Sequence, residues 1–116
     1  GVNLRGGPDR RAPVVRELDA LTPLRALGGN GTWLRARLPD GSRGYVAARL
    51  TEVVGEPVNE IRATSDLYLT ARPAEGAPVV DTAPSGTLLA VIGRFGEFAW
   101  IRGPHGRTGW ARLGGT

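Results

Sequence analysis

The sequence predicts an all-β protein that consists of two copies of one small unit. A comparison of the sequence with itself at a shift of 65 residues brings similar segments together along most of the chain. Apolar and polar residues alternate in several short segments, and Gly, Pro and Asn separate these segments at the positions where turns are expected. The similar segments include Val2-Asn3-Leu4-Arg5 with Leu67-Tyr68-Leu69-Thr70, Pro13-Val14-Val15 with Pro78-Val79-Val80, and Gly44-Tyr45 with Gly109-Trp110.

The composition excludes several classes of function. The 116 residues contain no Cys and one His, so disulfides, thiol nucleophiles, Cys-based metal sites and His clusters are absent. We therefore expect no catalytic residue, no metal and no cofactor. No apolar run approaches the roughly 18 residues that a membrane span needs. Because the sequence has no Met, we expect it to be part of a longer or processed polypeptide.

The central hairpin is the clearest element of the first copy. Residues 33–38 alternate strictly between apolar and polar types, which predicts a strand with one buried face. The turn-forming segment Pro39-Asp40-Gly41-Ser42 follows, and Gly44-Tyr45-Val46 is then the returning strand. The predicted buried face consists of Leu34, Ala36 and Leu38, and the opposite face of Trp33, Arg35 and Arg37.

The segment from residue 16 to residue 27 could form a helix, since Leu recurs at every third position. Pro23 interrupts this pattern, and the matching segment of the second copy contains Pro84 and Gly86, which a helix interior disfavours. The repeat therefore predicts two short strands around a turn. A single helical turn is expected at residues 47–49.

The second copy repeats the hairpin. Residues 99–102 and 108–111 flank the turn 103–106, and residues 87–92 predict a largely buried strand. A slip of two residues in the middle of the alignment places Trp33-Leu34-Arg35 on Trp100-Ile101-Arg102. Residues 51–60 have no counterpart in the first copy and are the expected connector between a first domain, residues 1–50, and a second, residues 61–116. Residues that match 61–66 would precede Gly1, so the opening strand of the first copy is expected to be truncated.

These motifs, in this order, resemble the bacterial SH3-like (SH3b) domain. The resemblance implies two tandem small SH3-like β-barrels, each partly open and built of five or six strands. It rests on the opening Val2-Asn3-Leu4-Arg5-Gly6-Gly7-Pro8, on Pro13-Val14-Val15, on Gly31-Thr32-Trp33-Leu34-Arg35-Ala36 and on the closing Gly44-Tyr45-Val46.

The resemblance implies binding and not catalysis. Bacterial SH3-like domains usually lie outside the cytoplasmic membrane, often beside a cell-wall hydrolase, and several recognise peptidoglycan peptides. We therefore expect a non-catalytic targeting region of a larger periplasmic, extracellular or cell-wall protein that recognises peptidoglycan or its stem peptides. The alternative is a docking or regulatory domain pair for a hydrolase or peptidase domain of the same polypeptide, without a ligand of its own. A net charge of +4, scattered along the chain, disfavours nucleic acid as the partner.

The resemblance also implies a groove between the first long loop and the aromatic residue that opens the central strand. A Trp provides an apolar platform there, and an adjacent Arg can bind a carboxylate of a wall peptide in a bidentate manner. This sequence departs from the family where Arg49 replaces a late Tyr that lines the groove, and where Thr70 replaces the opening Arg in the second copy. His105 is expected to be a solvated turn residue. The predicted ligand-binding residues are Asn3, Arg5, Trp33, Arg35, Tyr68, Trp100 and Arg102.

Overall fold

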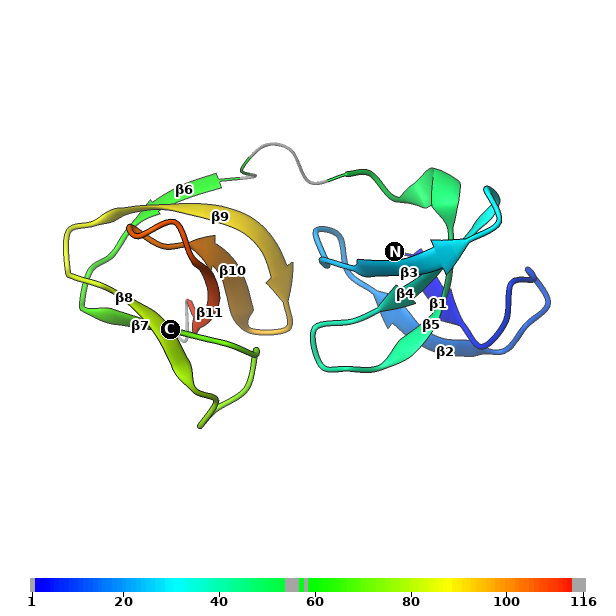
Figure 1. Cartoon of the computed structure of the whole chain (residues 1–116), viewed down its shortest axis with the longest axis horizontal. Helices are drawn as coiled ribbons and strands as arrows, with labels where there is room; N and C mark the ends of the chain where they lie inside the picture. The colour runs from blue at the N-terminus through cyan, green and yellow to red at the C-terminus, as the bar shows by residue number, and fades with distance from the viewer. Residues whose placement is uncertain (1, 54–56, 58, 114–116) are drawn as a thin grey trace. The chain divides into compact units, whose positions relative to one another are not determined.

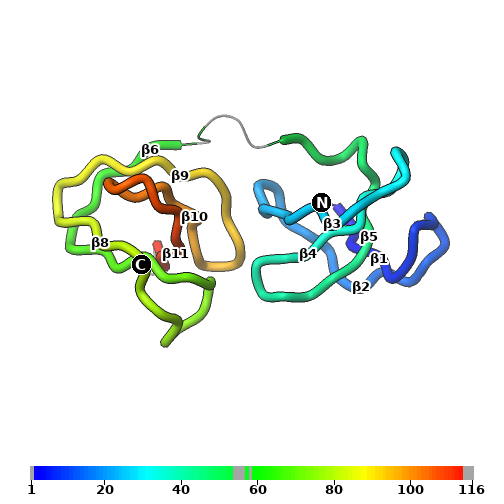
Figure 2. The backbone as a smooth tube through the Cα atoms, in the orientation of Figure 1, coloured from blue at the N-terminus to red at the C-terminus, as the bar shows by residue number. Residues whose placement is uncertain are grey.

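The protein is described by a computed structural model that covers residues 2–53, 57 and 59–113. The chain divides into two compact units, Gly1–Val53 and Val54–Thr116. Each unit contains one antiparallel sheet, which confirms the predicted all-β fold class (Figure 1, Figure 2). In the part of the chain that the structure describes, no helix has the length and apolar character that a membrane crossing requires.

The first unit is a five-stranded sheet in the order β2-β1-β5-β4-β3. Two strands around a turn replace the helix that the leucine spacing allowed, as the repeat predicted, and the expected helical turn begins one residue later, at Ala48. The buried side chains of this unit are Leu4, Leu18, Ala36, Leu38 and Val46. Its elements are β1 (Val2–Arg5), β2 (Val14–Leu18), β3 (Arg25–Gly29), β4 (Trp33–Arg37), β5 (Arg43–Ala47) and the 3-10 helix η1 (Ala48–Leu50).

The second unit is a six-stranded sheet in the order β6-β9-β10-β11-β7-β8. Read from β8, this order repeats that of the first unit and adds β6 outside β9. A cluster of eight buried residues, Leu69 and Ile101 among them, forms its core. The strands are β6 (Asn59–Arg62), β7 (Leu67–Thr70), β8 (Val79–Ala83), β9 (Leu88–Phe95), β10 (Phe98–Arg102) and β11 (Thr108–Arg112).

The strand pairings give both units the same register at a constant shift of 65 residues. Arg35 pairs with Tyr45 in the first unit, and Trp100 pairs with Trp110 in the second. Trp100 is therefore the counterpart of Arg35, and Phe98 is the counterpart of Trp33. The two-residue slip that matched Trp33 with Trp100 is wrong. A slip of two residues leaves every side chain on the same face of a strand, so alternation in the sequence cannot detect it.

The two hairpin turns are equivalent as well. The Gly41 N–H donates to the Leu38 carbonyl oxygen at 2.9 Å, and the Gly106 N–H donates to the Gly103 carbonyl oxygen at 3.1 Å. Both Gly41 and Gly106 have positive φ, 93° and 81°, a conformation that favours glycine. The predicted turns are thus confirmed.

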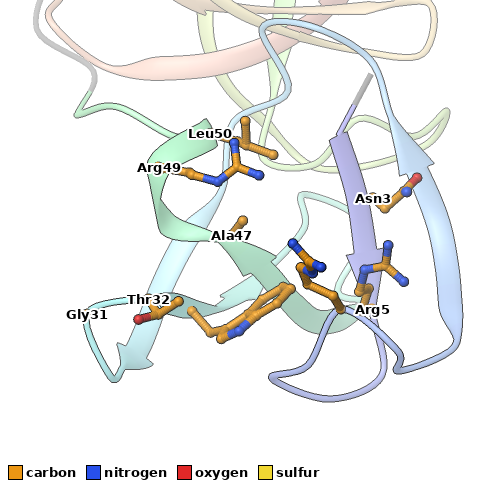
Figure 3. Close-up of a pocket in the computed structure, with 9 residues that line it drawn as sticks. Asn3, Arg5, Gly31, Thr32, Ala47, Arg49 and Leu50 are labelled. Atoms are coloured by element: carbon orange, nitrogen blue, oxygen red, sulfur yellow. The ribbon is translucent and has the colours of Figure 1, made fainter.

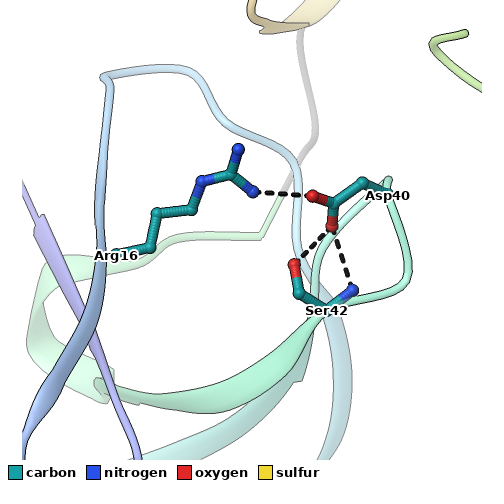
Figure 4. A network of polar contacts seen from close by, with 3 residues as sticks. All are labelled: Arg16, Asp40 and Ser42. Carbon is teal, nitrogen blue, oxygen red and sulfur yellow. Dashed lines mark hydrogen bonds and ion pairs between the residues drawn. The ribbon is translucent and has the colours of Figure 1, made fainter.

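A polar contact connects each turn to the second strand of its unit. In the first unit, Asp40 Oδ2 lies 2.7 Å from Arg16 Nη1, and Ser42 donates its backbone N–H and its hydroxyl to Asp40 Oδ1 (Figure 4). In the second unit the charges are exchanged: Asp81 stands at the position of Arg16 and His105 at the position of Asp40. His105 Nδ1 lies 2.7 Å from Asp81 Oδ1. The His105 side chain is 70% exposed, as expected for a turn residue, but it contacts a buried carboxylate that the sequence did not reveal.

These contacts lower the pKa of both carboxyl groups. Burial acts to raise the pKa of Asp40, but hydrogen bonds from Ser42 and Arg16 outweigh it. The hydrogen bond with His105 lowers the pKa of Asp81 against the effect of burial, and the Thr82 N–H contributes further. A carboxyl group with a lowered pKa stabilises the fold above its unfolded value of about 3.9, and this stabilisation is lost as the pH falls through the folded value. Acid therefore destabilises both units.

We expect the second unit alone to lose some stability as the pH rises from about 5.5 to about 8. A free imidazole titrates near pH 6.5, whereas a guanidinium stays charged, so His105 loses its charge over this range and Arg16 does not. The effect is modest because His105 is largely exposed. Urea unfolding at the two pH values, followed by the indole N–H signals of Trp33 in one unit and of Trp100 and Trp110 in the other, measures it. The variant His105→Gln should lose the difference, and an unchanged difference in that variant would contradict the assignment.

Candidate functional site

A pocket of about 690 Å³ opens on the first unit, on the face of the sheet that is turned away from its core. Leu4 is fully buried, so its neighbours on β1, Asn3 and Arg5, face the opposite side, where both line the pocket. Trp33 on β4 and Ala47 on β5 pair with each other and complete the part that the strands supply. The small side chain of Ala47 leaves the space between β1 and β4 open.

Three connecting segments form the rim of the pocket. The loop between β1 and β2 contributes Arg10, the turn before β4 contributes Gly31 and Thr32, and the 3-10 helix contributes Arg49 and Leu50. Figure 3 shows Asn3 and Arg5 on one side, with Thr32, Ala47, Arg49 and Leu50 on the other. The pocket thus combines residues that lie far apart in the sequence.

A turn centred on Asn30 determines where Trp33 begins its strand. Asn30 Oδ1 accepts the backbone N–H groups of Thr32 at 3.0 Å and of Trp33 at 2.8 Å. Gly31, at the centre of the turn, has φ of 90°. The Asn-Gly pair is therefore a turn signal, and its hydrogen bonds hold the backbone of Trp33 at the edge of the pocket.

The pocket is positively charged. Three of its lining residues are arginines, Arg5, Arg10 and Arg49, and none of the lining residues is acidic. Arg5 Nη1 donates to the Ala12 carbonyl oxygen at 2.9 Å, which connects this guanidinium to the loop that carries Arg10. An indole beside guanidinium groups suits a ligand that has both an apolar part and a carboxylate.

The structure brings together three of the four residues predicted in the first copy. Asn3, Arg5 and Trp33 line the pocket, whereas Arg35 is not among its lining residues. Arg35 is exposed and pairs with Tyr45, which in turn pairs with Arg5, so the Tyr45 strand position separates the two arginines.

Two pocket residues were missed. Arg10 lies in a loop whose path the sequence does not reveal. Arg49 could have been found, because it stands where the family has a Tyr that lines the groove.

Comparison with known proteins places the first unit in a family. Residues 1–52 match the bacterial SH3 domain. The first unit is a bacterial SH3 domain. The resemblance predicted from the sequence is thereby confirmed for the first copy. Bacterial SH3 domains are generally binding modules and not enzymes. A comparison with curated proteins gives no match.

The second unit has different side chains at the positions that form the pocket of the SH3 domain. Arg112 is the counterpart of Ala47, and its guanidinium carbon lies 5.3 Å from the ring centroid of Phe98, the counterpart of Trp33. Arg112 also pairs with Glu75 at 3.2 Å and with Glu97 at 3.4 Å. Glu75 stands at the position of Arg10. The second unit therefore places its own cation, held by two acids, where the SH3 domain has a cationic pocket.

The other residues predicted in the second copy lie on the same face of its sheet. Tyr68 is 61% exposed, and Trp100 is stacked on Trp110 with ring centroids 6.0 Å apart. Arg102 is exposed and is the counterpart of Arg37. Their role in binding stays a prediction.

Proposed function

We propose that the SH3 domain binds peptidoglycan through its stem peptides, in the pocket that Asn3, Arg5 and Trp33 line. The observation that carries this proposal is the presence of three arginines and one indole around a pocket without an acidic lining residue. Stem peptides carry free carboxylates, which an arginine fork binds in a bidentate manner, and short apolar side chains, which an indole can cover. The chain then acts as a non-catalytic targeting region of a larger bacterial protein in the periplasm or at the cell wall.

We also propose that the chain contains two tandem SH3-like domains, residues 1–50 and 61–116, joined by a connector at residues 51–60. The constant shift of 65 residues between the two sets of strand pairings supports this division. Because Arg112 lies where the first domain has its pocket, we assign ligand binding to the first domain. The second domain then serves as a docking or regulatory module for a hydrolase or peptidase domain of the same polypeptide.

Sedimentation of the chain with insoluble peptidoglycan tests the binding site. We expect Trp33→Ala and Arg10→Ala each to weaken binding by about tenfold or more, as expected for an aromatic or arginine anchor. Two matched controls should bind as the parent chain does. Arg35→Ala changes an exposed arginine on the strand of Trp33, and Arg11→Ala changes the loop neighbour of Arg10, and neither of these residues lines the pocket.

The outcomes separate the candidate functions. Unchanged binding by folded Trp33→Ala would show that the pocket assignment is wrong. A folded parent chain that does not sediment would favour docking to a catalytic domain as the function of the whole chain. Binding to nucleic acid that falls steeply with salt would identify a phosphate backbone as the ligand.

A further inference from the structure

The two units differ at one edge of their sheets. In the second unit, β6 runs antiparallel to β9, with Asn59 opposite Val91 and Ile61 opposite Leu89 (Figure 1). The counterpart of β9 in the first unit is β3, which pairs with β4 on one side. Among the residues that the structure describes, no strand pairs with the other side of β3.

The missing pairing changes the burial of the side chains beneath it. Val91 and Leu89 are 0% and 1% exposed, whereas their counterparts, Ala26 and Leu24, are exposed and partly exposed. Ala26 pairs with Ala36, which is fully buried, so both side chains are on the core face of the sheet.

The same contrast extends along the strand. Leu27 is 37% exposed, its counterpart Ile92 only 6%. All five residues of β3 are exposed. The first unit therefore presents core-facing apolar side chains and an open row of backbone groups at one edge.

We propose that this edge of β3 is a docking site for an extended polypeptide segment with the chemistry of β6. An unpaired strand edge accepts a further strand through backbone hydrogen bonds, and the side chains of that strand determine which sequences fit. The second unit supplies the template. Ile61 and Ala63 pack against its core, while Glu60 and Arg62 between and beside them are exposed. The occupant is thus a strand with small or branched apolar residues at alternate positions and charged residues in between.

The apolar edge is distinct from the cationic pocket. Pocket residues on the strands come from β1, β4 and β5, and none comes from β3. The proposal therefore does not rest on peptidoglycan binding, and a peptide strand at β3 can be detected without a wall ligand.

The test places the missing strand in the chain. In the grafted variant, a copy of residues 59–66 replaces Gly1 directly before Val2, which recreates the connection that leads from β6 to β7. We expect hydrogen-exchange protection at the amides of Leu24 and Ala26 to rise by about tenfold or more. The counterparts of these two amides lie opposite Ile61 and Asn59 in the second unit.

A second graft of the same length serves as the control. It carries Ile61→Asp in the copied segment, and it should give no protection, because a carboxylate cannot be buried against the apolar edge without a partner. No protection in the first graft, or equal protection in both grafts, would overturn the proposal. Protection in the parent chain that increases with protein concentration would also overturn it, since a second copy would then occupy the edge.

Discussion

The double substitution Ala47→Arg with Arg10→Glu is expected to abolish ligand binding by the first unit and to leave it folded. It transfers to the SH3 domain the pair that Arg112 and Glu75 form in the second unit at 3.2 Å. The new arginine would lie over Trp33 as Arg112 lies over Phe98, and it would fill the space that Ala47 leaves open. Losing one guanidinium and the indole platform together should weaken binding about 100-fold or more, which corresponds to about 2.7 kcal/mol.

Sedimentation with peptidoglycan measures the loss, and the dispersion of backbone amide signals verifies the fold. The control is the single substitution Arg10→Ala, which removes the charge without filling the pocket and should retain part of the binding. The reciprocal substitutions, Arg112→Ala with Glu75→Arg, should open the equivalent space in the second unit and give it weak affinity for the same ligand. Full binding by the first double variant would show that the ligand does not enter the pocket between β1 and β4.

The strands and turns were predictable because their signals are local. The alternation in residues 33–38 predicted the buried face of β4, and Ala36 and Leu38 are 0% and 2% exposed. Pro23 and its matching segment correctly argued against a helix, since proline removes a backbone donor wherever it stands. The positive φ of Gly41 follows from the hairpin turn that the sequence announces.

The register between the two copies was not predictable by the same means. Matching Trp33 to Trp100 is attractive because the residues are identical and the faces agree. Only the strand pairings distinguish the shift of 65 from a slip of two, because both place each side chain on the same face. The correct register makes Phe98 the counterpart of Trp33, and it makes the Arg112 contact comparable with the pocket.

The site was predictable where strands supply its residues. Asn3, Arg5 and Trp33 follow from the alternation on either side of buried residues and from the family resemblance. Arg10 depends on the path of a loop, which no periodicity encodes. The contact between His105 and Asp81 depends on a β2-like strand lying beside a hairpin turn 24 residues later in the chain, and this proximity is a property of the fold.

The substitution Leu4→Ala is expected to unfold the first unit at 25 °C, whereas Leu69→Ala at the equivalent position leaves the second unit folded. Both leucines are 0% exposed, and truncating such a side chain costs about 2–5 kcal/mol. A small single core rarely provides more than about 3–5 kcal/mol of net stability. The second unit has β6 and a core cluster of eight buried residues, so it has more stability to lose.

The indole N–H signals distinguish these outcomes within one chain. In Leu4→Ala the Trp33 signal should move to the position of an unfolded chain while the signals of Trp100 and Trp110 stay in place, and binding to peptidoglycan should disappear. In Leu69→Ala all three signals should keep their folded positions and binding should persist. Equal unfolding of both variants would contradict the difference in stability between the units. Because the two leucines occupy the same place in the same fold, a difference between the variants must come from the rest of each unit, and the largest such difference is the strand that covers β9 and leaves β3 open.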